Sequence, residues 1–142
     1  MLLPLLSATL VTAFTALGIL HVYWLGGGSL GITAAVPEKA GKPLFRPSKQ
    51  ATLLVALGLF GCAALVAVLV GWIPWPLSMR ALRLLGLAVA ALFLLRAIGD
   101  FKWVGFFKRE RGTTFATLDT GLYSPLCLGL ALGVLSLLLL RR

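Results

Sequence analysis

Four long apolar segments, separated by shorter stretches that carry most of the charge, constrain this chain more than any other feature. They cover residues 2–24, 50–70, 81–99 and 122–140 of the 142-residue sequence. A membrane-spanning helix needs about 20 mainly apolar residues, and the chain as a whole is 60% hydrophobic. Four such helices leave no room for a separate soluble domain. We therefore predict an all-α protein with one domain, a four-helix transmembrane bundle of antiparallel neighbours with two longer cytoplasmic loops.

Two other interpretations of the apolar segments are less favourable. A transmembrane β-barrel needs strands of about ten residues with alternating polarity, and these segments do not alternate. A signal peptide would carry positive charge before a shorter apolar region, whereas no Lys or Arg precedes the first segment. The first segment is accordingly predicted to be a true span.

The distribution of Lys and Arg predicts the orientation, because cytoplasmic loops are enriched in these residues. One side carries Lys39, Lys42, Arg46, Lys49, Arg96, Lys102, Lys108, Arg109 and Arg111. The other side carries Arg80, Arg83, Arg141 and Arg142. We predict a multi-pass protein of the bacterial inner membrane with the first and third loops in the cytoplasm and both termini outside. The net charge of +9 then suits contact with anionic membrane lipids, and no nucleic-acid partner is expected.

Shorter signals predict how the spans begin and end. Ser48 is a candidate N-cap of the second span. Residues 72–76, with two Trp and two Pro, predict a tight interfacial turn that makes the second and third spans an antiparallel hairpin. Ser124 and Pro125 resemble a helix start, although a start nearer Asp119 would give the fourth span a more usual length.

Several familiar motifs are absent or occur in the wrong context. Residues 26–31 match GxGxxG, but nucleotide binding by this motif requires a preceding strand, so we interpret them as a flexible helix exit. Cys62 and Cys127 fall at different depths and form no CxxC motif. We therefore predict no disulfide, no metal and no cofactor.

Polar residues of all four spans converge at the end of the bundle that carries the first and third loops. They are His21, Gln50, Arg96, Asp100, Asp119 and Tyr123. Ionisable groups at membrane depth are costly and usually face protein or water, so the convergence indicates a shared site. A structural role stays open: Arg96 could pair with Asp100 four residues later, Asp119 could be an N-cap, and His21 could bond a loop carbonyl.

Cations and aromatic rings are mixed at this end of the bundle, which favours a binding site for a lipid headgroup or a small anionic amphiphile. Arg96, with Lys102 or Lys108, would hold the anion, and aromatic side chains would hold the apolar part. The candidate ligand-binding residues are His21, Tyr23, Trp24, Arg96, Asp100, Trp103, Phe106, Phe107, Lys108, Asp119 and Tyr123.

Two other functions remain open. A membrane enzyme acting on a lipid or isoprenoid could use His21, Asp100 and Asp119 as acid–base groups. An oligomeric small-molecule transporter is less favoured, because all four acidic residues are predicted at or outside the membrane interface. Gly129 and Gly133 form a GxxxG motif, which predicts close helix packing, either within the chain or across a homodimer.

Several of these motifs also resemble a known family. The segments are HVYW at residues 21–24, LRAIGDF at 95–101, VGFFK at 104–108, LDT at 118–120 and YSPLC at 123–127. With the glycine-rich stretch after Trp24, they resemble the uncharacterised bacterial family called domain of unknown function 3995, over essentially the whole chain. The resemblance implies a small bacterial membrane protein and supports grouping Arg96, Asp100, Asp119 and Tyr123, but it implies no activity.

Overall fold

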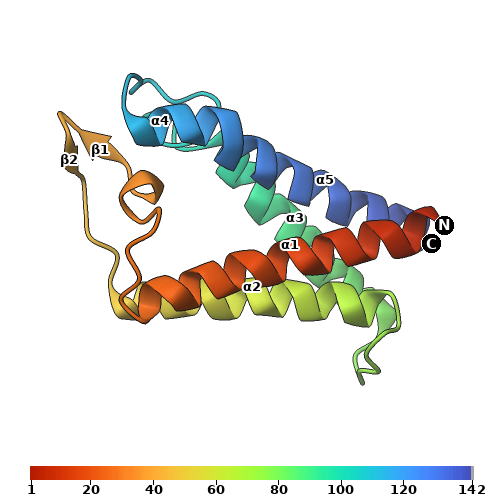
Figure 1. The fold of residues 1–142 in the computed structure, drawn as a ribbon. Helices are drawn as coiled ribbons and strands as arrows, with labels where there is room; N and C mark the ends of the chain where they lie inside the picture. The colour runs from red at the N-terminus through yellow and green to blue at the C-terminus, as the bar shows by residue number, and fades with distance from the viewer. Residues whose placement is uncertain (142) are drawn as a thin grey trace.

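The computed structural model describes residues 1–141 and is built mainly of helices (Figure 1). The long helices are α1 (Leu2–Leu25), α2 (Lys49–Leu69), α3 (Met79–Ile98) and α5 (Ser124–Leu140), and the short α4 (Thr114–Leu118) runs into α5 through the π-helical segment η2 (Asp119–Tyr123). Four helical stretches, the last being Thr114–Leu140, are long and apolar enough to cross a membrane. The predicted all-α four-helix transmembrane bundle is confirmed.

The connections differ in size. The first contains a 3-10 turn, η1 (Thr33–Ala35), and a two-stranded antiparallel ribbon of β1 (Glu38–Lys39) and β2 (Lys42–Pro43), in which Glu38 pairs with Pro43. The second is the short turn predicted between α2 and α3. The third, which we call loop three, covers residues 99–113.

The first three helices begin and end within two residues of the predicted bounds, and Ser48 is confirmed as the N-cap of α2. The fourth prediction was wrong at its start, because helical structure begins at Thr114. The Thr113 hydroxyl accepts a hydrogen bond from the Ala116 N–H at 3.0 Å and caps that helix. Ser124 therefore lies inside the helix, and Pro125 is tolerated after the π-helical segment.

The helices pack as two pairs, α1 with α2 and α3 with α5 (Figure 1). The pairs lie close together at the end that holds the termini and diverge toward the first loop and loop three. Contacts of α1 with α5 and of α2 with α3 join the pairs. Among the contacts between the pairs, the rings of Phe14 and Phe93 lie 5.4 Å apart, and Leu10 packs on Gly133. The hairpin of α2 and α3 exists, but each helix contacts its pair partner more extensively than the other.

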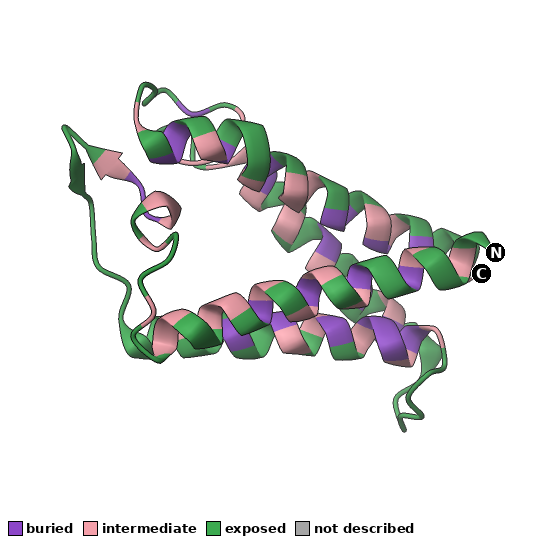
Figure 2. Cartoon of the chain, in the orientation of Figure 1, coloured by how far each residue is buried: buried purple, intermediate pink, exposed green. Residues whose placement is uncertain are grey.

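Burial follows this arrangement (Figure 2). The largest fully buried apolar side chains, Phe14, Val66, Leu69, Val134 and Leu137, face other helices. Leu5, Leu54 and Leu92 are exposed on the outer surface, as expected for helices whose other faces meet lipid. Exposed apolar surface of this extent marks a membrane-facing surface.

The two glycines of the GxxxG motif are not equivalent, and this allows a test. A Cβ at Gly133 would lie 2.8 Å from Leu10 Cδ2, whereas nothing lies within 4 Å of one at Gly129. We expect Gly133→Leu to destabilise the protein by roughly 1–3 kcal/mol through overpacking and Gly129→Leu to leave its melting temperature nearly unchanged. Thermal unfolding in detergent measures both. Equal effects, or a loss of oligomer in Gly129→Leu alone, would contradict a purely intramolecular use of the motif.

Candidate functional site

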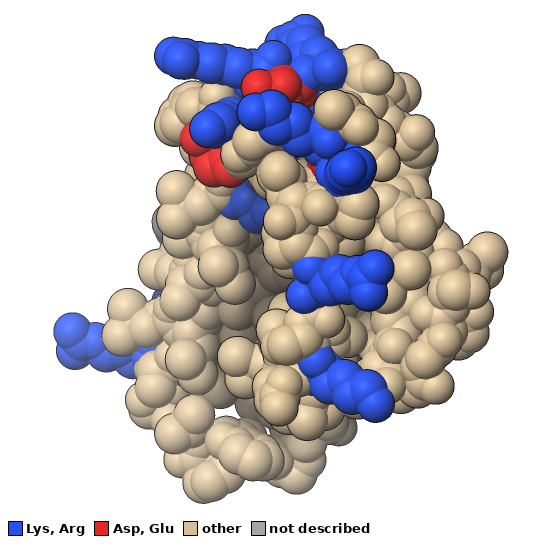
Figure 3. All heavy atoms as spheres, turned by 90° about the vertical axis from the view of Figure 1, so that its left-hand side faces the viewer, with Lys and Arg blue, Asp and Glu red and all other residues tan. Residues whose placement is uncertain are grey.

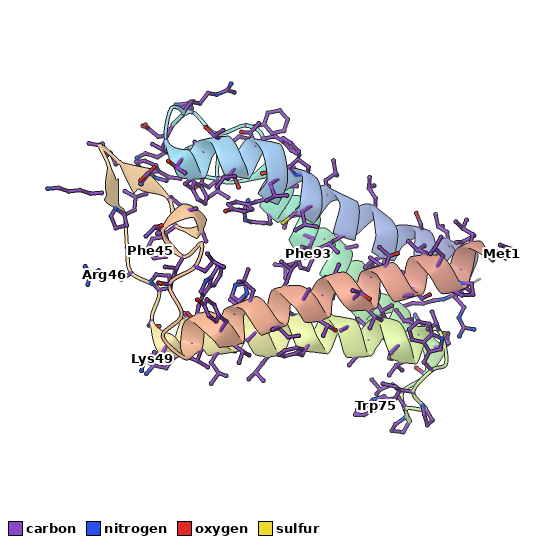
Figure 4. The ribbon with its side chains drawn as sticks, viewed as in Figure 1. Met1, Phe45, Arg46, Lys49, Trp75 and Phe93 are labelled. Atoms are coloured by element: carbon purple, nitrogen blue, oxygen red, sulfur yellow. The ribbon has the colours of Figure 1, made fainter. Side chains whose placement is uncertain are left out.

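The face that carries the first loop and loop three is hollowed between the two helix pairs, with Lys and Arg side chains around the depression (Figure 3). We call this depression the hollow. Phe93 projects from α3 toward α1 where the pairs meet (Figure 4). Phe93, which is half-buried, therefore forms the apolar floor of the hollow over the fully buried Phe14.

One face of α1 provides the first wall. Leu10 and Phe14 contact the other pair, and residues three or four apart share a helix face. Leu17, His21 and Trp24 continue this face beyond Phe14, toward the end where the pairs diverge. All three side chains are half-buried. Leu17 packs against the edge of the apolar core, and the rings of His21 and Trp24 contact each other.

The opposite wall comes from α3 and the start of α5. Arg96 follows Phe93 by one helical turn and lies on the same face of α3. The Tyr123 hydroxyl donates a hydrogen bond to the Ala34 carbonyl oxygen at 3.1 Å. This bond ties η1 of the first loop to the α3/α5 pair, so the first loop crosses the open end between the two pairs (Figure 1).

A buried carboxylate organises this wall. Asp119 is fully buried, and its Oδ1 accepts a hydrogen bond from Arg96 Nη2 at 2.8 Å. Its Oδ2 accepts from Lys108 Nζ at 2.9 Å and from the Gly105 N–H at 2.7 Å. Asp119 therefore fixes the end of α3 and loop three to the beginning of the fourth spanning helix.

The two cations on Asp119 are in different situations. Lys108 is only 3% exposed, and its ammonium also donates to Gly105 O at 3.0 Å and Thr120 Oγ1 at 2.6 Å. All three of its donors are thus occupied. The side chain of Arg96 is 34% exposed, and its Nη1 has no hydrogen-bond partner among residues 1–141. Arg96 is the cation that retains donor capacity.

Asp100 has a separate, local role. Helix α3 ends at Ile98, and Gly99 has φ +91°, so the helical face does not continue to residue 100. The Oδ1 of Asp100 accepts from the N–H groups of Lys102, Trp103 and Val104 at 2.9, 2.7 and 3.0 Å. The suggested Arg96–Asp100 ion pair was wrong, since Arg96 pairs across helices with Asp119.

Two other structural alternatives were also wrong. Asp119 is not an N-cap, because Thr113 caps the helix six residues earlier. His21 does not bond a loop carbonyl: its Nδ1 lies 2.8 Å from the Leu17 carbonyl oxygen of its own helix. Its ring meets the ring of Trp24 edge-on, with centroids 4.9 Å apart.

The remaining aromatic candidates mostly shape the loops. Trp24 Nε1 donates to the Leu30 carbonyl oxygen at 2.8 Å, and the Tyr23 ring covers Gly28, so both fold the first loop back on α1. Lys102 Nζ lies 5.3 Å from the ring centroid of Trp103. Phe106 is half-buried, and Phe107 is exposed beside Phe101. The contacts of Trp103 and Phe107 lie within loop three, which suits a segment in the headgroup layer.

The hydrogen bonds to Asp100 predict a pH effect confined to loop three. Slight desolvation raises the pKa of Asp100, but hydrogen bonds from the Lys102, Val104 and Trp103 N–H groups lower it more, so the pKa lies below its ordinary value. The resulting stabilisation is present above the unfolded pKa of about 4 and is lost as the pH falls through the folded value. We expect hydrogen-exchange protection of these three amides to fall between pH 6 and pH 3.

Asp100→Asn is the matched control for this effect, because its amide oxygen can still accept hydrogen bonds but does not titrate in this range. Its protection, once corrected for intrinsic exchange, should be lower at pH 6 and independent of pH. A wild-type protein with equal protection at both pH values would contradict the assignment.

Comparison with protein families gives one match. The family described as "Protein of unknown function (DUF3995)" matches residues 14–134. The chain belongs to this family. The DUF3995 match confirms the resemblance and spans every residue placed here in the hollow and around Asp119. No curated protein and no solved structure matches the chain.

Sequence reasoning missed three groups that hold this region together. They are the Gly105 N–H, the Thr120 hydroxyl and the Ala34 carbonyl. Two are main-chain groups, for which the identity of the side chain carries no signal. The glycines at 99 and 105, both with positive φ, were the available sign that loop three has a fixed backbone.

Proposed function

We propose that the hollow binds an anionic amphiphile, such as a lipid headgroup with its tail, and that Arg96 holds the anion. The single observation that carries the proposal is the Arg96 guanidinium, which shares Asp119 with Lys108 and keeps Nη1 without a protein partner. A buried donor without an acceptor costs about 1–3 kcal/mol. An anion beside Arg96 would supply that acceptor.

The charge at the site supports an anion. Two cations, Arg96 and Lys108, meet one carboxylate, so the network carries one excess positive charge when all three groups are ionised. Lys108 is saturated by protein acceptors. A guanidinium offers planar paired donors that match phosphate and carboxylate oxygens, which makes Arg96 the contact point.

The apolar floor supports an amphiphile instead of a simple inorganic anion. Phe14 and Phe93 lie deeper than Arg96, and Leu17 lies between Phe14 and His21 on the α1 wall. With the positively charged loops at the cytoplasmic surface, the headgroup would sit near the inner leaflet of the bacterial inner membrane and the tail would point toward the bilayer centre. Membrane lipids are the natural source of such a molecule.

The enzyme alternative receives less support. Both oxygens of Asp119 are bound by cations and a main-chain N–H, and Asp100 holds the backbone of loop three. A general acid or base must reach its substrate at hydrogen-bonding distance. Among the three proposed acid–base residues, Asp119 has no free oxygen, while His21 Nε2 and Asp100 Oδ2 have no hydrogen-bond partner within residues 1–141.

Arg96→Gln tests the proposal. Asp119 would keep Lys108 and Gly105 as partners, so the variant should still fold, while the affinity for an anionic amphiphile should fall at least tenfold, or about 1.4 kcal/mol. Native mass spectrometry of the detergent-purified protein, with lipid extraction from the same sample, measures occupancy. Arg109→Gln is the control, because Arg109 is exposed in loop three and its loss changes the net charge equally.

The two variants separate site binding from general attraction to anionic lipid. The proposal predicts a bound anionic molecule in the wild type and in Arg109→Gln that is lost from Arg96→Gln. The same lipids in the same amounts in all three proteins would refute it.

A further inference from the structure

One ring nitrogen of His21, Nε2, has no hydrogen-bond partner within residues 1–141. Its Nδ1 lies 2.8 Å from the Leu17 carbonyl oxygen. A carbonyl oxygen can only accept, so Nδ1 carries the hydrogen, and in the neutral ring Nε2 is left as an acceptor. The structure gives Nε2 no hydrogen-bond partner within residues 1–141.

Packing restricts how the imidazole can turn. The bond to Leu17 holds one edge of the ring, and the indole of Trp24 meets it at an interplanar angle of 66°. Trp24 is itself held by its hydrogen bond to Leu30 O. These two contacts hold the ring, and with it Nε2, in one orientation on the α1 face that continues from Leu10 and Phe14.

The two walls of the hollow therefore offer complementary groups. On the α3 side, the buried Nη1 of Arg96 is a cationic donor without a protein acceptor, and on the α1 side, His21 Nε2 has no protein partner. We infer that the ligand of the hollow is an anionic amphiphile whose headgroup also carries a hydroxyl, with the anion at Arg96 and the hydroxyl donating to His21 Nε2. This inference rests on the proposed function and adds the class of headgroup.

Specificity follows from the acceptor. A site built to hydrogen-bond a hydroxyl rejects an analogue without it, because the polar group of the protein is then left unpaired. A headgroup of the same charge without a hydroxyl should bind roughly tenfold more weakly, the value expected for one hydrogen bond of this kind.

Phosphatidylglycerol and phosphatidylethanol provide the test, because with equal acyl chains both carry one negative charge and only the first has headgroup hydroxyls. Each is titrated in detergent against wild type, His21→Phe and His21→Gln. The Phe variant keeps an aromatic ring beside Trp24 without a nitrogen, and the Gln variant can place an amide oxygen near the position of Nε2. We expect the wild type to prefer phosphatidylglycerol about tenfold, His21→Phe to bind both lipids equally, and His21→Gln to regain part of the preference.

Glycerol 1-phosphate, a soluble anion with hydroxyls, distinguishes the source of the headgroup. Competition that depends on His21 would support the same chemistry in a soluble ligand, and failure to compete, with tight phosphatidylglycerol binding, would support a lipid. Suppose that the wild type binds both lipids equally and that Arg96→Gln binds neither. This result would overturn the inference and leave the proposed function intact. Lipid binding that is unchanged in Arg96→Gln would overturn the proposed function itself. Matched melting temperatures establish that the His21 variants are folded.

Discussion

Asp119→Asn is expected to destabilise the protein by about 3–5 kcal/mol, the cost of removing one partner from a buried ion pair. Asp119 is fully buried, and Lys108 is almost as deeply buried. Asparagine would leave the Lys108 ammonium and the Arg96 guanidinium without an anion and would put an amide where two cations converge. Thermal unfolding of the detergent-purified variant measures the loss.

Two further proteins make this result specific. Glu110→Gln removes an exposed acid from loop three and should change stability by less than about 0.5 kcal/mol. Asp119→Asn combined with Lys108→Met removes the buried charge as well as its partner, so part of the stability should return. If Asp119→Asn and Glu110→Gln have the same melting temperature, the Asp119 carboxylate does not organise the site.

Gly105→Ala is expected to have the second large effect. Gly105 is buried with φ +90°, and a Cβ there would collide with the backbone of Ile98 and Gly99, which cannot move aside as a flexible side chain can. Strained backbone of this kind costs about 1–3 kcal/mol. Any shift that relieves it would also break the hydrogen bond from the Gly105 N–H to Asp119. We expect a total loss of roughly 3 kcal/mol or more in thermal unfolding.

Gly112→Ala is the matched control for this substitution. Gly112 also lies in loop three with φ +83°, but nothing lies within 4 Å of a Cβ at this position. Its substitution should cost only the conformational term, about 1–2 kcal/mol. Equal effects at the two positions would mean that the close approach of loop three to the end of α3 does not matter for stability.

The sequence predicted the spans well because their signal is local. About 20 apolar residues define a spanning helix whatever it packs against, and α1, α2 and α3 match the prediction closely. The start of the last helix could not be found in the same way. Thr113 provides a cap before residues that are not strongly apolar, and a π-helical segment then continues into α5, so apolar composition alone placed the start too late.

The sequence grouped the polar residues at one end of the bundle but paired them wrongly. The spacing of Arg96 and Asp100 suggests one helix face only if the helix continues, and Gly99 ends it. Lys108 looked like one more interfacial cation, whereas the fold of loop three brings Gly105, Asp119 and Thr120 around it. Such contacts depend on chain segments that no local pattern connects.

The divergence of the two helix pairs could not be predicted from the sequence either. The spans are apolar on nearly all sides, so their composition does not distinguish a face that meets lipid from one that lines the hollow. His21 and Arg96 were recognisable as costly polar groups. That they belong to different helix pairs follows from the packing of α1 with α2 and of α3 with α5.

Photocrosslinking tests the central claim, that an anionic amphiphile occupies the hollow, most directly. The probe is phosphatidylglycerol with a diazirine in its acyl chain, and the crosslinked positions are mapped by peptide mass spectrometry. The account predicts crosslinks concentrated at the half-buried residues Leu17, His21 and Phe93, and lost from these positions in Arg96→Gln. Crosslinks spread over outward-facing residues such as Leu54 and Leu92, and unchanged in Arg96→Gln, would contradict it.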